Sequence, residues 1–253
     1  MSDSANDRAV LGVDIGGSGM KAALVDPIAG TRVSDRRRIR TPKPAVPTAM
    51  QTTFEELRDH FDYSGPIGCT FPGVIRAGTT VMTAANLDPS WVGVDAADLF
   101  GADHSPVTMI NDGDAAGIAE MRHGAGVGVR GTVILVTIGT GLGTAVFTDG
   151  VLVANTELGH VELGGEDAEK RASSRVIDDE GLSFTDWAPR FEAYLHHIEQ
   201  LFWPELFILG GGISKDFDRW SPMISIDTPV VPAALRNHAG IIGAAIVAAA
   251  NRY

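Results

Sequence analysis

The stretch AVLGVDIGGSGMKAALVD, from Ala9 to Asp26, decides the fold of this chain. A short apolar run of the kind found in buried strands ends at Gly16, and a second apolar run begins after Gly19. This pattern predicts a β-hairpin with a glycine-rich turn. Such a turn lets backbone N–H groups approach a phosphate, because no Cβ atom stands in the way.

Asp14 stands just before the glycines of this turn, where a carboxylate would repel a phosphate. Its position makes sense if a divalent cation lies between the two, since Mg²⁺ prefers carboxylate, water and phosphate oxygen as ligands. Lys21 adds a positive charge on the phosphate side. An ordinary hairpin with an exposed aspartate is the alternative. The stretch is neither a Walker loop nor a Rossmann fingerprint, because no GK[ST] or GxGxxG opens a helix here.

The pattern recurs in the second half of the chain. TVILVTIGTGLGTAVF, from Thr132 to Phe147, is again an apolar strand, a glycine turn and another strand. The glycine-rich segment from Gly124 to Gly131 separates the two halves. Between the hairpins, helical and strand patterns alternate, which predicts an α/β protein with an internal repeat. Two such hairpins could hold a phosphate chain from both sides.

Composition limits the class of protein. The chain has 253 residues, of which 44% are hydrophobic and 21% charged, as is ordinary for a globular protein. A net charge of −12 argues against general nucleic-acid binding but leaves an anionic small substrate open. The single cysteine, Cys69, excludes disulfide frameworks and cysteine-based zinc sites, and we expect a small buried thiol.

The first eight residues, MSDSANDR, are polar and carry no signal-peptide core, so we expect a disordered lead-in at residues 1–8. No apolar stretch reaches membrane-spanning length. The sequence therefore predicts a cytoplasmic protein with no membrane partner.

Five arginines lie between Thr31 and Arg40, on what we expect to be one exposed strand. They either protect a sheet edge or form a basic rim for a long anion. Helices are expected over about 48–61, 184–202 and 237–250. Asn111, Asp112 and Asp114 follow an apolar strand and precede another helix, and such corners carry the chemistry of α/β proteins.

Six motifs occur along the chain in the order DIGGSGMK, TFPG, NDGDAAG, IGTGLG, ELGH and LGGGISK. In this order they resemble the ROK family of sugar kinases. Longer runs, such as FTDGVLVANTELGHVE and LFWPELFILGGGISK, are most similar to the glucokinase branch of that family that uses polyphosphate.

The resemblance implies the actin-like ATPase (ribonuclease H-like) fold, with two α/β domains around a cleft. The N-terminal domain is expected at residues 1–111, completed by a C-terminal helix at 237–253, and the C-terminal domain at 112–236.

The activity implied by the resemblance is phosphoryl transfer from polyphosphate, and from ATP, to the 6-hydroxyl of glucose. An alcohol is a poor nucleophile, so a carboxylate must accept its proton. By resemblance this general base is Asp112, with Asp114 as the obvious rival. The residues expected to bind the sugar are Gly73, Asn111, Glu157, His160 and Glu169.

The phosphate-binding residues implied by the resemblance are Gly16, Gly17, Ser18, Lys21, Thr140 and Gly141. Asp14 is expected to hold Mg²⁺ through water, and Gly211 and Gly212 to lie under a nucleotide base. The cysteine-rich zinc motif of many ROK proteins is replaced here by DAEKRASS, so we expect no structural zinc. A metal site that uses His160 is the competing interpretation.

A homodimer is also expected from the resemblance. Two alternative functions stay open at this stage. One is an ATP-only ROK hexokinase acting on glucose or mannose, and the other is a non-catalytic sugar-binding regulator.

Overall fold

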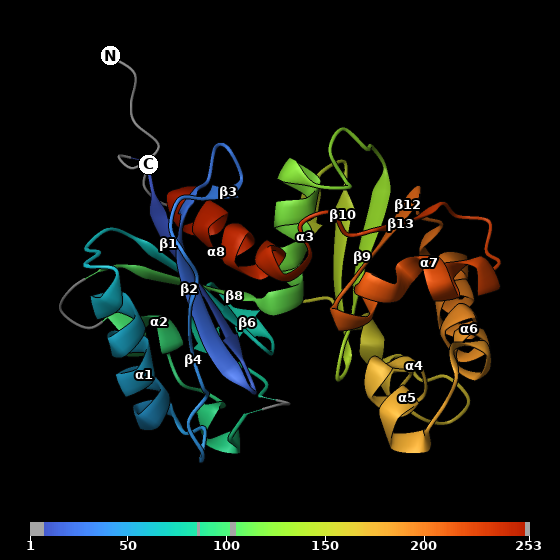
Figure 1. The fold of residues 1–253 in the computed structure, drawn as a ribbon, viewed down its shortest axis with the longest axis horizontal. Coiled ribbons are helices and arrows are strands. Elements are labelled where there is room, and N and C mark those ends of the chain that lie inside the picture. The colour runs from blue at the N-terminus through green and yellow to red at the C-terminus, as the bar shows by residue number, and fades with distance from the viewer. Residues whose placement is uncertain (1–7, 85–86, 102–104, 251–253) are drawn as a thin grey trace. The chain divides into compact units, whose positions relative to one another are not determined.

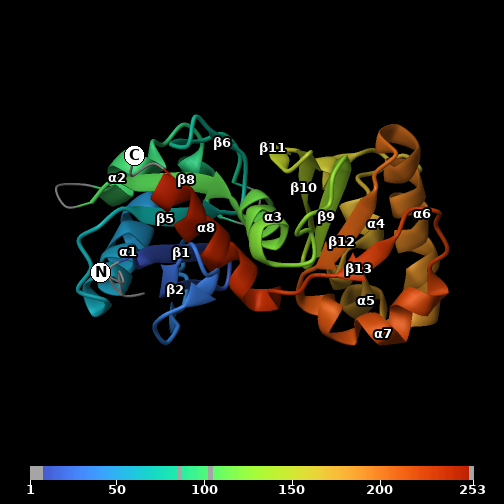
Figure 2. The same cartoon turned by 90° about the horizontal axis from the view of Figure 1, so that it is seen from above.

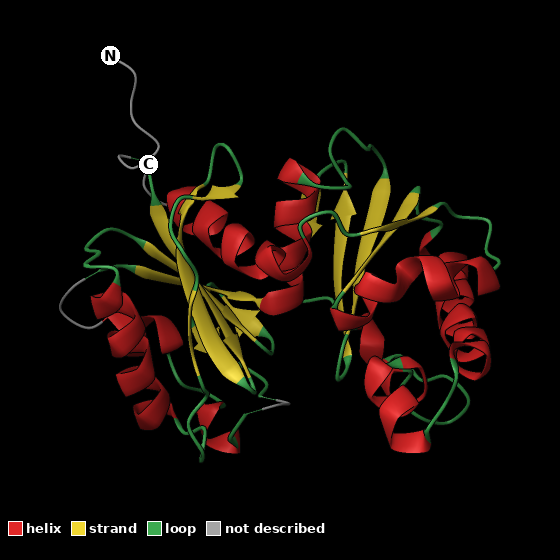
Figure 3. Cartoon of the chain, viewed as in Figure 1, coloured by secondary structure: helices red, strands yellow, loops and turns green. Residues whose placement is uncertain are grey.

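The computed structural model describes residues 8–84, 87–101 and 105–250. These residues form two compact units. Unit 1 consists of the described residues within Met1–Ala119 and His238–Tyr253, and unit 2 of those within Glu120–Asn237. Both contain helices and strands (Figure 3). Among the described residues, no helix is long and apolar enough to cross a lipid bilayer.

Unit 1 is built on a mixed β-sheet. Its elements are β1 (Val10–Gly16), β2 (Gly19–Asp26), β3 (Thr31–Arg32), β4 (Arg37–Ile39), α1 (Pro47–His60), β5 (Ile67–Phe71), β6 (Ile75–Arg76), β7 (Thr80–Val81), α2 (Ala96–Gly101), β8 (Val107–Asn111), α8 (Ala239–Ala250) and the first part of α3 (Asp112–His123). In the described residues the sheet has the order β3-β2-β1-β5-β8, and β4 pairs with β2. As predicted, β1 and β2 form an antiparallel hairpin around the glycine turn, whereas β1, β5 and β8 run parallel.

Helices α1 and α8 lie on opposite faces of this sheet (Figures 1 and 2). Met20 and Ala22 of β2 belong to the core cluster that also contains Met50 and Phe54 of α1. Because side chains alternate along a strand, Lys21 points to the other face, which α8 covers.

The uncharged helix α8 is buried along most of its length, as its composition predicted. It packs with its backbone almost against the sheet, because glycines leave room for it. A Cβ atom on Gly12 would lie 2.2 Å from the carbonyl oxygen of Ile241, and one on Gly68 would lie 1.8 Å from that of Ala244. Larger residues at either position would push the helix away.

Unit 2 has its own sheet. Its elements are β9 (Thr132–Ile138), β10 (Leu142–Thr148), β11 (Val151–Val153), α4 (Glu169–Ala172), α5 (Ser174–Glu180), α6 (Phe184–Phe202), β12 (Leu206–Gly210), α7 (Phe217–Trp220) and β13 (Val230–Pro232). Short 3₁₀ helices η2 (Leu158–His160) and η3 (Gly212–Asp216) connect them. The strand order in the described residues is β11-β10-β9-β12-β13.

The predicted internal repeat is therefore present at the level of topology. Each sheet contains an antiparallel hairpin around a glycine turn, β1–β2 or β9–β10. A third antiparallel strand extends the second strand of the hairpin, and two parallel strands extend the first. This shared order places both glycine turns at equivalent positions of their sheets.

The aromatic residues predicted for the core of the second half are buried. Trp187, Phe191 and Tyr194 of α6 belong to one core cluster with Trp220 of α7. The rings of Trp187 and Phe191 are stacked, and those of Trp187 and Trp220 lie edge to face. Cys69 is also fully buried, as predicted, and burial raises the pKa of its thiol well above the ordinary value.

Two local predictions were wrong. The arginine-rich segment is not one strand but two short ones, β3 and β4, separated by a bend at Ser34, whose Oγ accepts from the Leu24 N–H at 2.9 Å. The disordered lead-in was expected to include Arg8, but Arg8 pairs with the buried Asp26 at 2.9 Å. The rest of the lead-in lies outside the described residues.

Candidate active site

The first glycine turn is closed by the pairing of Gly16 with Gly19, and Gly17 and Ser18 at its tip are exposed. Only glycine fits at position 19 beside the Arg38 side chain, because a Cβ atom there would lie 2.7 Å from Nε of Arg38. The turn thus presents exposed backbone next to a guanidinium group, a favourable environment for an anion.

Asp14 and Lys21 are cross-strand partners on β1 and β2. Nζ of Lys21 donates to Oδ2 of Asp14 at 3.0 Å, and Oγ1 of Thr70 donates to its Oδ1 at 3.0 Å. Thr70 also accepts from the Ile15 N–H at 3.2 Å. The sequence analysis missed Thr70, which fixes the orientation of the Asp14 carboxylate and is itself fully buried.

Asn111 ends β8, and Asp112 begins α3. Oδ1 of Asn111 accepts from the Asp114 N–H at 3.0 Å, so Asn111 caps the helix, while its Nδ2 donates to the carbonyl oxygen of Gly73 at 3.1 Å. The two candidate bases differ in accessibility. Asp112 is half-buried, whereas Asp114 is only 1% exposed.

Gly73 has a packing reason for being glycine. A Cβ atom there would lie 2.2 Å from the carbonyl oxygen of Thr83. The register aligns Asp14 with Thr70 and Phe71 with Asn111, so these predicted residues of unit 1 gather at the carboxyl ends of parallel strands. That edge is where open α/β sheets bind ligands.

In unit 2, Glu157 and His160 lie at the two ends of η2. Nε2 of His160 is 3.8 Å from Oε2 of Glu157, so one short helix directs both side chains to one place, as their spacing predicted. Thr144 of β10, which the sequence analysis missed, anchors this helix: it donates to the Thr156 carbonyl oxygen and accepts from the Leu158 N–H at 3.1 Å.

Two carboxylates approach the other ring nitrogen of His160. Nδ1 lies 3.4 Å from Oδ2 of Asp167 and 3.9 Å from Oε1 of Glu169. Ligand atoms of these three residues lie within 4.8 Å of one another, so the group could also hold a metal ion. The sequence analysis did not single out Asp167. The sequence offered a signal for Asp167, because this carboxylate lies two residues before Glu169, within the segment that replaces the cysteine motif.

The pKa of Glu157 is raised. The main cause is burial, which disfavours the charged carboxylate; the negative charge of Glu169 adds to it, and His160 acts in the opposite direction. A carboxylate, a second carboxylate and an imidazole together supply the acceptors and donors that a ring of sugar hydroxyls requires.

The second glycine turn, between β9 and β10, lies against Glu169, one of the carboxylates near His160. Oε2 of Glu169 accepts from the Leu142 N–H at 3.3 Å, and a Cβ atom on Gly141 would lie 2.4 Å from that oxygen. Ser174 holds the other end of the turn by donating from Oγ and N to the carbonyl oxygen of Gly139, at 2.7 and 2.9 Å. Thr140 at the tip is exposed.

Gly211 and Gly212 follow β12, next to β9. Gly211 has a φ of 85°, and a Cβ atom there would lie 2.2 Å from the carbonyl oxygen of Ile138. A Cβ atom on Gly212 would meet nothing within 4 Å. The backbone therefore explains Gly211, whereas Gly212 borders open space.

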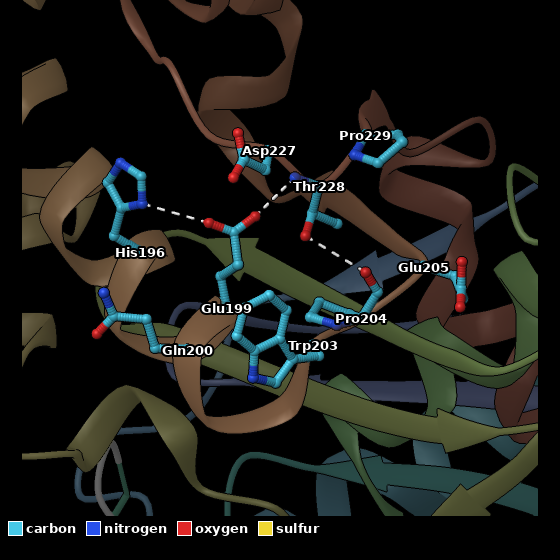
Figure 4. Close-up of a pocket in the computed structure, with 9 residues that line it drawn as sticks. All are labelled: His196, Glu199, Gln200, Trp203, Pro204, Glu205, Asp227, Thr228 and Pro229. Carbon is cyan, nitrogen blue, oxygen red and sulfur yellow. Dashed lines mark hydrogen bonds and ion pairs between the residues drawn. The ribbon is translucent and has the colours of Figure 1, made fainter.

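A pocket of about 450 Å³ opens elsewhere on unit 2, where α6 ends (Figure 4). The ring of Trp203, 77% exposed, forms part of its wall. Glu199 accepts from the Thr228 N–H at 2.6 Å and lies 3.3 Å from Nδ1 of His196. None of the predicted site residues lines this pocket, so it is separate from the predicted chemistry.

Known proteins resemble this chain along nearly its whole length. Residues 10–174 match the sequence model of the ROK family. A protein named polyphosphate glucokinase from Mycobacterium tuberculosis (strain CDC 1551 / Oshkosh) is 48% identical over 242 residues, which cover 95% of this chain and 91% of that protein.

Two solved structures share the fold. The inorganic polyphosphate/ATP-glucomannokinase from Arthrobacter sp. strain KM is 46% identical, covers 97% of this chain and 99% of its own, and superposes with a TM-score of 0.90. A ROK family glucokinase from Streptomyces griseus, in complex with glucose and AMPPNP, is 25% identical, covers 95% and 99%, and has a TM-score of 0.79. Because the family model, these relatives and the two hairpin-based sheets agree, the chain belongs to the ROK family and has the actin-like ATPase fold of that family's sugar kinases.

Proposed function

We propose that this protein transfers a phosphoryl group from inorganic polyphosphate to the 6-hydroxyl of glucose, and that ATP serves as a second donor. In the structure, the proposal depends chiefly on Asp112, a half-buried carboxylate at the sheet edge that also carries Asp14 and Lys21. The choice of donor and sugar follows the names of the relatives that share 46–48% of their residues with this chain.

Asp112 is the proposed general base. It must accept the hydroxyl proton as the new P–O bond forms, and a base that substrate can reach is required for this. Asp114 is the weaker candidate because it is almost fully buried and its backbone N–H bonds to the cap of α3. Asn111, Gly73, Glu157, His160 and Glu169 are the proposed sugar contacts.

The proposed phosphate contacts are the two glycine turns, at Gly16–Ser18 and Thr140–Gly141, with Lys21. Gly211 and Gly212 are proposed to border the base of a nucleotide donor. Preorganised N–H groups and a fixed ammonium stabilise charge that develops on the transferred group.

Asp14 suits Mg²⁺, because it is an oriented and partly exposed carboxylate beside a phosphate turn. Mg²⁺ keeps several waters and binds through one or two carboxylates and substrate phosphates, so a single aspartate is a sufficient protein ligand. When bound, the ion would neutralise phosphate charge. The Lys21 ammonium at 3.0 Å already offsets the charge of Asp14 and favours binding through water.

The test is an assay of glucose 6-phosphate formation with Mg²⁺, run separately with long-chain polyphosphate and with ATP. Activity with polyphosphate is expected. Activity with ATP alone would select an ATP-only hexokinase, and glucose binding without activity would select a regulator.

Asp112→Asn tests the base. We expect turnover to fall by about 10²–10⁴-fold, the usual contribution of a general base, while the dissociation constant for glucose stays within a few fold. Asp114→Asn is the matched variant. Turnover that survives in Asp112→Asn but is lost in folded Asp114→Asn would transfer the role to Asp114.

A cytoplasmic location and a homodimeric state are further parts of the proposal. The homodimeric state follows from the resemblance, and light scattering of the purified protein tests it; cell fractionation tests the location.

A further inference from the structure

The arginine-rich segment presents its side chains on two faces of the sheet of unit 1. Arg38 of β4 is the direct cross-strand partner of Lys21, which is in turn the partner of Asp14. Directly paired residues share a face, so these three side chains form a row across three strands. The row lies on the face that α8 covers, since a Cβ atom on Gly240 would be 3.5 Å from Cγ of Asp14.

Arg38 is fixed at the tip of the first glycine turn. Its Nη2 donates to the carbonyl oxygen of Ser18 at 3.1 Å, and Gly19 leaves the space that the guanidinium group fills. The group therefore stands where the turn would hold a phosphate, with Lys21 beside it.

Two further arginines continue this row away from the turn. Arg32 of β3 pairs with Val25 of β2, which points to the same face as Lys21. Val25 lies four positions after Lys21 on β2, a distance of about 13 Å at about 3.3 Å per residue. Arg32 and Arg36 both act on His238, directly before α8: burial and then these two positive charges lower the pKa of that imidazole. The register thus places Arg32 on the α8 side of the sheet, and Arg36, one residue before β4, is close enough to His238 for its charge to act on that imidazole.

In the described part of the chain, these guanidinium groups have no acidic partner. Within the described residues, no carboxylate lies within 4.0 Å of a nitrogen atom of Arg32, Arg36 or Arg38. By contrast, Arg37 pairs with Glu56 of α1 on the opposite face, at 3.9 Å. In a chain with a net charge of −12, an uncompensated row of arginines on one face is an anion-binding arrangement.

We propose that Arg38, Arg36 and Arg32 form a cationic track on unit 1, in which Arg38 binds a polyphosphate chain at the glycine turn beside Lys21, and Arg36 and Arg32 bind its phosphates beyond the turn. The track deepens the proposed function and rests on it. Guanidinium groups suit this role because their planar fork matches phosphate oxygens. The N-terminus of α8, beside Asp14, adds the positive end of a helix dipole to the same face.

The track should make the affinity for polyphosphate depend on the length of the polyphosphate chain. Arg38 contacts the turn, so it serves short and long anions alike. Arg32 and Arg36 lie farther along and meet only an anion that extends past the turn. A long polyphosphate reaches them, whereas tripolyphosphate held at the turn does not.

The test compares the wild type with Arg32→Gln/Arg36→Gln, using calorimetric dissociation constants for long-chain polyphosphate and for tripolyphosphate. Two exposed charge contacts of a few fold each predict about a ten-fold weaker binding of the long chain, with the tripolyphosphate constant changed less than two-fold. The KM for long-chain polyphosphate should rise by the same factor at unchanged kcat. Arg38→Gln should weaken both anions.

The matched control is the single variant Arg37→Gln, compared with Arg36→Gln, because Arg37 lies on the opposite face and pairs with Glu56. Both remove one exposed charge from neighbouring positions, but only Arg36→Gln should weaken the long chain. Equal effects of these two variants, or equal losses for both anions in the double variant, would overturn the track. A wild type inactive with polyphosphate would overturn the proposed function and the track with it, whereas an active wild type with unaffected variants overturns the track alone.

Discussion

Glu120 offers a sharp test of how unit 2 is held together. It is fully buried in α3, yet it is a carboxylate. Its oxygens accept from the backbone N–H groups of Ala125 at 2.9 Å, Ala234 at 3.0 Å and Leu235 at 2.7 Å. This one side chain therefore joins α3 to the segment that precedes α8 in the sequence.

The perturbation is Glu120→Gln, which keeps the shape of the side chain. An amide has one acceptor oxygen, so at least one of the three N–H groups loses its partner, at a cost of about 1–3 kcal/mol. The bonds that survive lose their charge assistance, about 1 kcal/mol each. The neutral amide does not carry the desolvation cost of a buried carboxylate, and this offsets part of the lost stability. We expect a net loss of about 2–3 kcal/mol in the free energy of unfolding.

Urea unfolding followed by tryptophan fluorescence measures this loss, since Trp187, Trp203 and Trp220 belong to unit 2. The midpoint should fall while the slope with urea stays unchanged. Glu166→Gln, on an exposed glutamate, is the matched control and should have almost no effect. A change below about 0.5 kcal/mol for Glu120→Gln would refute the reasoning, because surface substitutions produce that much.

Three other predictions concern the candidate site. Because burial and Glu169 raise the pKa of Glu157, its hydroxyl-accepting charged form is lost earlier as the pH falls; the KM for glucose should therefore rise on acidification, and Glu157→Gln should remove that dependence. Asp167→Ala should raise the KM for glucose about two- to five-fold by releasing His160, and Asp167→Asn, which keeps an acceptor, should recover most of it; a pure kcat effect would contradict this. Gly211→Ala should cost about 2 kcal/mol or more, seen as a lower Tm, because its Cβ would collide with Ile138.

The repeat and several local elements were predictable from the sequence because they depend on residues that are close together in the chain. A glycine turn between two apolar runs has few structures available, and so β1–β2 and β9–β10 form as expected. The charge-free segment of α8 could only be buried. The spacing of Glu157 and His160 limited them to one helical turn.

Other features escaped prediction because their partners are distant in the sequence. Thr70 orients Asp14 from 56 residues away, and Glu120 reaches Leu235 across 115. Gly12 and Gly68 look like weak points of two strands, yet each makes room for α8. No local pattern contains such contacts.

The sequence by itself determined the two hairpins, the buried helices and the identity of the residues with chemistry to offer. Only the tertiary structure decided which of them face one another, and the arginine segment shows this most clearly. Its composition permitted a charged sheet edge or an anion rim, because side chains alternate between faces only once the strand is paired. The register with β2 then placed Arg38 beside Lys21 and the phosphate turn, and left Arg37 to pair with Glu56 on the other side.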